Sequence, residues 1–258
     1  GTHRVSPWLV DCLRIAREIT GLSDGAWCAT MLPLVRLWRQ AARDGAEPTT
    51  QALTAALATC APDAWDLDGD SLQVHAPDLA FDLGGLAKGF AVDLVVAGLR
   101  SRGIDDLLVQ VGGETACHGR SSSGDPHRIG IPHPDDPDGS WNAVLSDPGT
   151  GLCGSTSGDY RQGVVVAGET HHHVIDPRTG RAAASRISSV TCVFTGLGRN
   201  AFADGLSTAA TVIGVQGLSV LRAATGCEGC TLRRDPQRGM LATVTPGWDA
   251  LLADDRTG

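Results

Sequence analysis

The first 60 residues carry apolar positions at helical spacing. Ser6-Pro7 suits a helix N-cap and first turn, and the apolar residues that follow recur every three or four positions until Gly21. A second apolar stretch covers 31–38 and runs into polar residues that end at Gly45. Thr49 or Thr50 is placed to cap a third helix through Leu57. The pattern predicts helices throughout this region.

From residue 71 the pattern changes to short alternating or apolar stretches that end at turn residues. Helices are expected after Gly84-Gly85 to about residue 102, and at 199–213 and 216–224. Pro and Asp crowd Pro132–Gly139, which predicts a surface loop there. Strands are predicted at 71–75, 79–82, 107–111 (as a buried strand), 128–132, 141–146, 151–156, 172–176, 188–194, 229–234 and 240–245.

Helices first, then mixed strands and helices, are typical of an α+β fold with a mixed, largely antiparallel sheet. With 258 residues the chain has enough length for a sizeable buried core. We expect a single domain over 1–258, with a helical part at 1–65 and a sheet-containing part at 66–258.

Charge and hydropathy exclude several classes of protein. The net charge of −8 argues against a nucleic-acid binder, because neutralising phosphates needs a basic face. No run of about 18 apolar residues occurs, so no transmembrane segment is expected, and no signal peptide is recognised. Of 21 basic residues only Lys88 is a lysine, and it lies in a glycine-rich segment.

The eight cysteines are scattered. Cys227 and Cys230 form the one close pair, and no second pair or histidine follows at the spacing of zinc ligands. Structural or incidental cysteines are therefore favoured over a metal or redox site.

The segment from Asp82 to Asp93 combines a strand end, a glycine pair and a helix start. A helix N-terminus presents unpaired N–H groups and the positive end of a dipole, which suit a phosphate or a carbonyl-rich ring. Lys88 adds a cation about one turn into the helix. The same residues also fit a plain strand-to-helix turn with Asp82 as its cap, and the spacing matches neither the Rossmann nor the Walker pattern.

Two more segments offer polar or open backbone. Gly112-Gly113 follows the strand at 107–111, where glycines allow a ligand to approach the backbone, although a turn also explains them. The stretch from Ser155 to Arg161 carries three hydroxyl side chains, Gly158 and the only tyrosine. It fits either a donor-rich binding loop or a Ser/Thr turn or helix cap.

Three consecutive histidines, His171 to His173, precede a turn at 176–180. Alternate residues of a strand point to opposite faces, so His171 and His173 would share one face and His172 would take the other. This alternation argues against a zinc site made by the three histidines and favours one functional histidine.

Asp204, Ser207 and Thr208 are spaced i, i+3 and i+4, so a helix would place their oxygens on one side. A carboxylate with two hydroxyls is the hard-oxygen ligand set that Mg²⁺ or Ca²⁺ prefers. An ordinary polar helix face is the alternative.

Taken in order, these five segments resemble the FAD:protein FMN transferases, the ApbE-like flavin-transfer family. The resemblance runs from about Val5 nearly to residue 245, and 33–38 matches as well. Members bind FAD with Mg²⁺ and transfer FMN onto a Thr or Ser hydroxyl of an acceptor flavoprotein, with release of AMP. Some members instead hydrolyse FAD to FMN and AMP. The resemblance also implies an ApbE-like, T-fold-like architecture.

The resemblance implies roles for particular residues. A base must take the proton from the hydroxyl of the acceptor protein, and His173 or Asp204 is the candidate. The unperturbed pKa of histidine suits that task near neutral pH. The expected metal ligands are the Gly85 carbonyl, Asp204, Ser207 and Thr208. The expected FAD contacts come from Ala26, Trp27, Cys28, Asp82, Lys88 and Ile175, together with Gly112, Gly113, Ser157 and Gly158 from the two segments described above.

Two positions depart from the family pattern on the FAD side of the site. Members carry an N-terminal stretch that contributes a Met, an aromatic residue and an Asn near the flavin, and at most Gly1-Thr2 corresponds to it here. Cys28 stands where an acidic residue is expected. A non-catalytic flavin-binding module is therefore a further interpretation. The family is often exported and lipid-anchored, which implies the periplasm or the cell surface, with the cytoplasm as the alternative.

Overall fold

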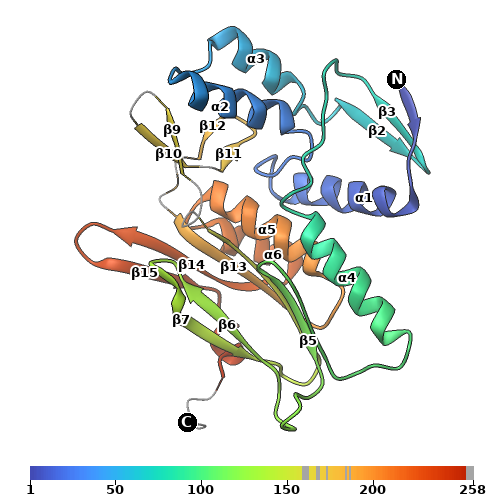
Figure 1. Cartoon of the computed structure of the whole chain (residues 1–258), viewed down its shortest axis with the longest axis vertical. Helices are drawn as coiled ribbons and strands as arrows, with labels where there is room; N and C mark the ends of the chain where they lie inside the picture. Colours follow the sequence, from blue (N-terminus) through green and yellow to red (C-terminus); the bar gives the residue numbers. More distant parts are fainter. Residues whose placement is uncertain (159–162, 167–168, 173, 184, 186, 254–258) are drawn as a thin grey trace.

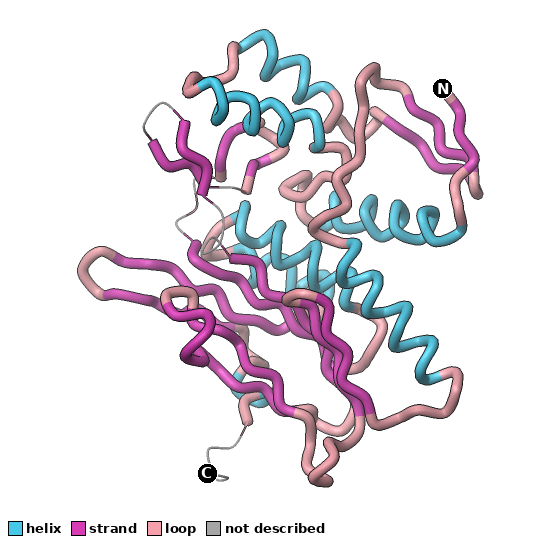
Figure 2. Tube along the Cα trace, viewed as in Figure 1, coloured by secondary structure: helices cyan, strands magenta, loops and turns pink. Residues whose placement is uncertain are grey.

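A computed structural model of the chain describes residues 1–158, 163–166, 169–172, 174–183, 185 and 187–253. Its centre is a six-stranded sheet in the order β15-β14-β13-β8-β5-β4, and each pair of neighbours is antiparallel (Figures 1 and 2). The strands are β4 (Leu107–Val111), β5 (Glu114–His118), β8 (Leu152–Gly158), β13 (Ile187–Thr195), β14 (Glu228–Asp235) and β15 (Gly239–Val244). The predicted α+β fold with a largely antiparallel sheet is confirmed.

The sheet is buried on both faces because successive strand residues point to opposite sides. Cys192, Cys153 and Ala116 face a core formed with α4 (Ala87–Arg100), α5 (Asn200–Ile213) and α6 (Gly217–Thr225). Their neighbours Val193, Leu152 and Cys117 face a second core under the hairpin of β6 (Arg128–His133) and β7 (Asp136–Ser146), which the short helix η1 (Asp249–Leu251) completes.

The helical part lies beyond one end of this sheet (Figure 1). Helix α1 (Pro7–Leu22) packs on α5, and α2 (Leu32–Asp44) packs on α3 (Thr50–Ala58). A three-stranded sheet in the order β1-β3-β2 joins β1 (Thr2–Arg4), β3 (Ser71–Val74) and β2 (Trp65–Asp68). Two hairpins complete the described elements: β9 (Gly163–Val166) with β10 (Glu169–His172), and β11 (Ile175–Asp176) with β12 (Arg181–Ala182).

Helices α1 and α3 begin where the capping residues predict. The Ser6 side chain accepts a hydrogen bond from the Leu9 N–H at 3.3 Å, with Pro7 in the first turn. The Thr49 side chain accepts one from the Ala52 N–H at 3.2 Å. Side-chain acceptors at these positions stabilise a helix because the first N–H groups have no partner within it.

Helices α4 and α5 cross in close contact, and this crossing builds the site described below. Asp93 of α4 accepts hydrogen bonds from the Asn200 and Ala201 N–H groups, each at 3.0 Å, and so caps α5 from another helix. Gly89 allows the approach, since a Cβ there would lie 2.2 Å from the Asn200 carbonyl oxygen.

Four local predictions are wrong. Pro132–Gly139 is not a surface loop, because β6 and β7 pair through it with register shifts on both sides of Pro132, which lacks an N–H to donate. Residues 79–82 form no strand; Asp82 is held by its N–H to the Ala29 carbonyl. The strand at 107–111 lies at the sheet edge, with Leu108 49% exposed.

The fourth error concerns the N-terminal region, which is not helical throughout. It opens with β1 and reaches β2 at Trp65. Strand β5 was not predicted, and the strand expected at 172–176 is divided between β10 and β11. No helix in the part of the chain that the structure describes has the length and apolarity needed to cross a membrane.

Candidate functional site

A cavity of about 1140 Å³ lies where the helical part meets the ends of β4, β5 and β8. This volume exceeds the roughly 300–1,000 Å³ of typical small-molecule pockets, so a ligand as large as a dinucleotide has room. Most of the predicted site residues line it: Ala26, Trp27, Cys28, Asp82, Gly85, Lys88, Gly112, Gly113, Ser157, Gly158, Ile175, Asp204 and Thr208. Residues from six distant segments therefore meet at one cavity.

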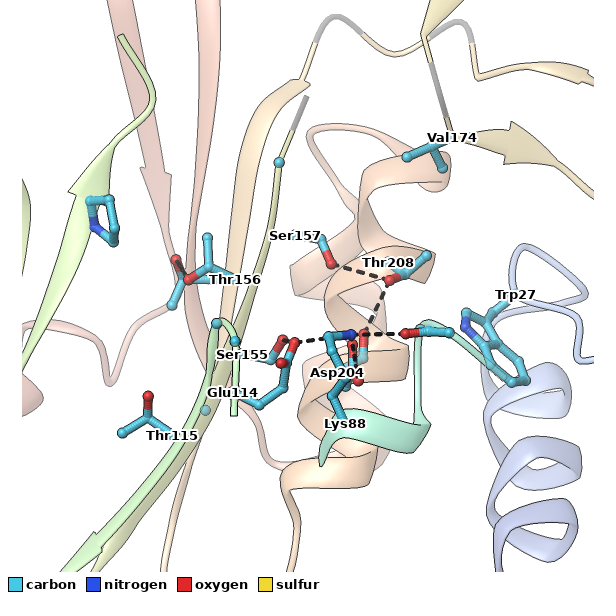
Figure 3. Close-up of a pocket in the computed structure, with 18 of the residues that line it drawn as sticks. Trp27, Lys88, Glu114, Thr115, Ser155, Thr156, Ser157, Val174, Asp204 and Thr208 are labelled. Carbon is cyan, nitrogen blue, oxygen red and sulfur yellow. Dashed lines mark hydrogen bonds and ion pairs between the residues drawn. The ribbon is translucent and has the colours of Figure 1, made fainter. Parts of the chain in front are cut away.

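Lys88 is the centre of a buried ion cluster (Figure 3). Its ammonium Nζ lies 3.3 Å from Asp204 Oδ2 and 3.3 Å from Glu114 Oε1, and it donates to the Gly84 carbonyl at 2.8 Å. Both carboxylate side chains are almost completely buried, at 3% and 4% exposure, whereas Lys88 is 44% exposed toward the cavity. One cation therefore faces two buried anions, which leaves the cluster with a net negative charge.

The environment of Asp204 changes its protonation. Burial, and then the charge of Glu114, raise its pKa to about 6, although Lys88 and the Gly89 N–H partly oppose this rise. Burial by itself lowers the pKa of Lys88, but Asp204 and Glu114 outweigh it and the net shift is upward. Lys88 therefore stays charged, while Asp204 gains and loses its proton near neutral pH.

Three hydroxyl groups lie beside the ion cluster. Ser157 Oγ is 2.7 Å from Ser207 Oγ and 3.1 Å from Thr208 Oγ1. Ser207 and Thr208 both donate to the Asp204 carbonyl one turn earlier in α5. Thr208 lines the cavity, but Ser207 is completely buried behind it and is absent from the wall. The predicted helix face thus holds together, with Ser157 of β8 as an added member and Ser207 beneath the surface.

The turn before α4 brings the backbone into the site. Asp82 Oδ1 accepts from the Gly84 N–H at 2.9 Å, so Asp82 both caps the turn and lines the cavity. A Cβ on Gly85 would lie 3.2 Å from Thr208 Oγ1 and 3.2 Å from Trp27 Nε1. Glycine at this position therefore lets α5 and the Trp27 segment close around the turn.

Ile175 forms part of the apolar side of the site. It packs with α2 and α3. The indole N–H of Trp38 in α2 donates to the carbonyl of Gly180, in the turn between β11 and β12, at 2.6 Å. The hairpin of β11 and β12 is thereby fixed to α2. Met31, Val35 and Trp38 continue this apolar wall.

His173 lies outside the described residues, and the predicted alternation of the three histidines is not tested. Glu114 is a site residue that sequence reasoning missed. It follows Gly112-Gly113 directly, and a carboxylate next to this glycine pair was the one available signal. Ser155, whose hydroxyl donates to Glu114 Oε1 at 3.2 Å, belongs to the segment considered as a binding loop, although it was not among the expected ligand contacts.

The donor atoms of this cluster fit a hard divalent cation. Glu114 Oε2 is buried and has no hydrogen-bond partner, so the cluster has an acceptor to spare. Within the described residues no three His, Cys, Asp or Glu side chains gather as a metal site. The remaining oxygens come from hydroxyls and backbone carbonyls, which suits Mg²⁺ better than Zn²⁺.

Comparison with known proteins decides the family. The profile described as the ApbE family matches residues 1–230. This chain belongs to the ApbE family. An FAD:protein FMN transferase of Vibrio cholerae is 35% identical over 223 residues, which are 85% of this chain and 65% of that protein. One of Klebsiella pneumoniae is 32% identical, over 90% of this chain and 69% of that protein. The chain therefore spans about two thirds of the length of these relatives.

Solved ApbE structures share the fold. The structure of flavin transferase ApbE from Vibrio cholerae matches with a TM-score of 0.82 at 30% identity, covering 98% of this chain and 79% of that chain. The apo form of flavinyl transferase ApbE from Pseudomonas stutzeri matches with a TM-score of 0.82 at 30% identity, covering 98% of this chain and 78% of that one. The predicted family and fold class are both confirmed.

Proposed function

We propose that this chain is an Mg²⁺-dependent flavin transferase that moves FMN from FAD onto a Thr or Ser hydroxyl of an acceptor protein and releases AMP. The observation that carries the proposal is the convergence of carboxylate, ammonium and hydroxyl groups on one large cavity in an ApbE-family chain. The naming of its relatives as FAD:protein FMN transferases supports the choice of donor and product.

The two sides of the cavity suit two different parts of a ligand, a pyrophosphate and a flat ring. Lys88, in the first turn of α4, offers a cation to a pyrophosphate. The glycines at the β4–β5 turn let a ligand approach the backbone, and the wall of Trp27, Met31 and Ile175 suits a flat ring. FAD carries both a pyrophosphate and a flat ring, which is why we assign it to this cavity.

Asp204, Thr208 and the Gly85 carbonyl are the groups that we propose hold Mg²⁺, with Ser157 and Glu114 next to them. When bound, the metal would neutralise the pyrophosphate and the developing charge on the AMP phosphate. Ser207 would support this group from behind the cavity wall, through its hydrogen bonds to Ser157 and to the Asp204 carbonyl.

In the proposed step the acceptor oxygen attacks the phosphorus on the FMN side of the pyrophosphate. A new phosphoester bond forms, the P–O bond to AMP breaks, and the acceptor proton passes to a base. His173 and Asp204 are the two candidates, and if Asp204 holds the metal the proton falls to His173. Lys88 would hold the pyrophosphate so that the leaving oxygen stays in line.

Stability against pH gives a prediction that does not depend on turnover. The pKa of Asp204 is raised to about 6 from 3.8, so without metal its stabilising contribution is complete below about pH 4 and is lost as the pH rises through about 6. Mg²⁺ needs the carboxylate, so we expect the rise in Tm produced by MgCl₂ to grow between pH 5 and 7. Differential scanning fluorimetry with and without MgCl₂ measures it.

Glu114→Gln is the matched variant for this measurement. Removing the charge of Glu114 removes one of the causes that raise the pKa of Asp204, so the Mg²⁺ effect should begin at lower pH. A Tm rise that is independent of pH in the unmodified protein would contradict the assignment of Asp204 as a ligand.

One incubation tests the proposed reaction itself. The protein is mixed with FAD, MgCl₂ and an acceptor flavoprotein domain, and the acceptor mass and AMP are measured together. We expect the acceptor to gain the mass of an FMN phosphoester and AMP to form in equal amount. AMP with an unmodified acceptor would mean FAD hydrolysis. As a control, a known transferase must modify the same acceptor. If it does and this protein still forms no AMP, the protein is a non-catalytic flavin-binding module.

A further inference from the structure

Two cysteine side chains meet at the wall of the cavity. Cys28 lines it, and Cys60 follows the end of α3 and is partly exposed. Cys28 Sγ donates to the Cys60 carbonyl oxygen at 3.7 Å, and the two thiols lie close enough for each to shift the pKa of the other. The segments are joined a second time, because the Thr59 hydroxyl donates to the Thr30 carbonyl at 3.2 Å. The folded chain therefore holds these thiols together.

The two thiols differ in reactivity. The hydrogen bond from Cys60 is the largest cause that lowers the pKa of Cys28, to about 6, and bonds from the Thr30 hydroxyl and backbone N–H add to it, while burial opposes them. The same contact raises the pKa of Cys60. Of the two thiols, Cys28 therefore loses its proton more easily, and the thiolate is the form that reacts with oxidants.

A second thiol pair in the same chain lacks access. Cys192 and Cys227 also shift the pKa of each other, and that of Cys227 is lowered to about 7. Both side chains have 0% exposure in the core between the sheet and the helices. The chain therefore contains an internal comparison between an accessible pair and a sealed one.

We propose that Cys28 and Cys60 are a redox pair that a hydroperoxide converts to a disulfide in the wall of the cavity. The Cys28 thiolate attacks one oxygen of the hydroperoxide, the O–O bond breaks, and Cys28 becomes a sulfenic acid as hydroxide or alkoxide leaves. The Cys60 sulfur then attacks the Cys28 sulfur, and hydroxide leaves and takes the Cys60 proton as water. With hydrogen peroxide, two thiols and one peroxide give one disulfide and two waters.

The bond would join positions 28 and 60 across both α2 and α3 and fasten the 26–28 wall to the end of α3. A cross-link over a loop of this length is expected to raise Tm by roughly 5 to 10 °C. A ligand in the cavity would cover Cys28 and slow its oxidation. The slowing by a ligand rests on the proposed function, with FAD as that ligand, whereas the disulfide itself does not.

The test uses the whole chain, first reduced and then treated with hydrogen peroxide at a few equivalents without flavin. Remaining thiols are alkylated, and the digest is analysed by mass spectrometry. We expect a cross-linked peptide pair containing Cys28 and Cys60, a loss of two mass units, and reversal by dithiothreitol. Cys192 and Cys227 should be recovered as free thiols after unfolding.

Cys60→Ser and Cys12→Ser are the matched variants. In Cys60→Ser, Cys28 should stop at a sulfenic acid that dimedone traps, with no rise in Tm on oxidation. In Cys12→Ser, a variant of a buried thiol in α1, the cross-link should form as before. Oxidation of Cys28 to sulfinic acid without a cross-link in the unmodified chain would overturn the proposal. So would oxidation of Cys192 and Cys227 at an equal rate.

Repeating the oxidation with FAD and MgCl₂ separates this proposal from the proposed function. Where flavin fluorescence shows FAD bound, we expect disulfide formation to slow at least threefold. If FAD is bound but disulfide formation is not slowed, the inference that bound FAD covers Cys28 is wrong. If FAD does not bind but the disulfide forms, the redox pair stands and the proposed function fails.

Discussion

Replacing Asp204 by Asn is expected to reduce Mg²⁺-dependent FMN transfer by about 100- to 1000-fold, the size of effect seen when one preorganised charge-stabilising group is removed. The substitution keeps the shape of the side chain but removes the charge that would hold the metal beside the pyrophosphate. Lys88 keeps its contact with Glu114 and its bond to the Gly84 carbonyl, so the turn before α4 should survive. AMP release and acceptor mass, each across a titration of MgCl₂, measure the effect.

Two comparisons make this result specific. Asp235→Asn, at the turn between β14 and β15, changes a carboxylate that does not line the cavity, and transfer should stay within about twofold of the unmodified chain. The Tm of Asp204→Asn should show that the variant is folded. Transfer that survives in Asp204→Asn with an unchanged Mg²⁺ dependence would mean that the metal site lies elsewhere.

Replacing Gly89 by Ala is expected to lower the free energy of unfolding by about 2 to 4 kcal/mol. The new Cβ would lie 2.2 Å from the Asn200 carbonyl oxygen and 2.8 Å from the Ala201 N. These atoms belong to the start of α5, which Asp93 holds in place, so the helices must move apart to relieve the overlap. That movement would also lengthen the 3.3 Å contact between the Gly89 N–H and Asp204, so transfer should fall too.

Gly98→Ala is the matched control in the same helix. The nearest atom to its Cβ would be Arg102 Nη1 at 3.5 Å, an ordinary contact with a flexible side chain. Alanine favours helix over glycine, so this variant should be as stable as the unmodified chain or more stable by up to about 1 kcal/mol. Urea denaturation of both variants gives the difference. Equal stability of the two would show that α4 and α5 are not in contact at Gly89.

The site is assembled from several segments of the chain, and the close crossing of α4 and α5 at Gly89 brings two of them together. Asp204 comes from α5, Lys88 from α4, and Glu114 from β5, and no two of them lie within 20 residues of each other in the chain. The pKa of Asp204 is a property of that assembly, since burial and Glu114 raise it. The pKa of Asp204 therefore cannot be predicted from the residues next to it in the sequence.

The sequence alone determined the local structure wherever a side chain acts on its own neighbours. Ser6 and Thr49 cap the helices that they were expected to cap, because a side-chain oxygen and the first helical N–H groups are a few residues apart. The ordered matches around Asp82, His173 and Asp204 pointed to the family, which the comparisons confirm. The spacing of Asp204 and Thr208 placed both oxygens on one side of a helix, and both line the cavity.

Prediction from the local sequence pattern was wrong where the neighbouring strand determines whether, and in which position of a sheet, a segment forms a strand. Pro132 lies in a strand because β7 lies beside it and a register shift accommodates its missing N–H. Residues 107–111 are apolar enough for a central strand, yet the order of the sheet leaves them at its edge. Whether a strand is central or at the edge depends on contacts with residues far away in the chain, which a window of sequence does not contain.

The tertiary structure alone decided the composition of the site. Ser207 belongs to the predicted helix face but is sealed beneath Ser157 and Thr208, and Glu114 enters from a strand that was not predicted. It also brought Cys28 to Cys60, thiols that composition gave no reason to pair. The physical reason is the same in each case. Burial, charge compensation and thiol contact depend on atoms that folding brings together, whereas the sequence specifies only which groups are available.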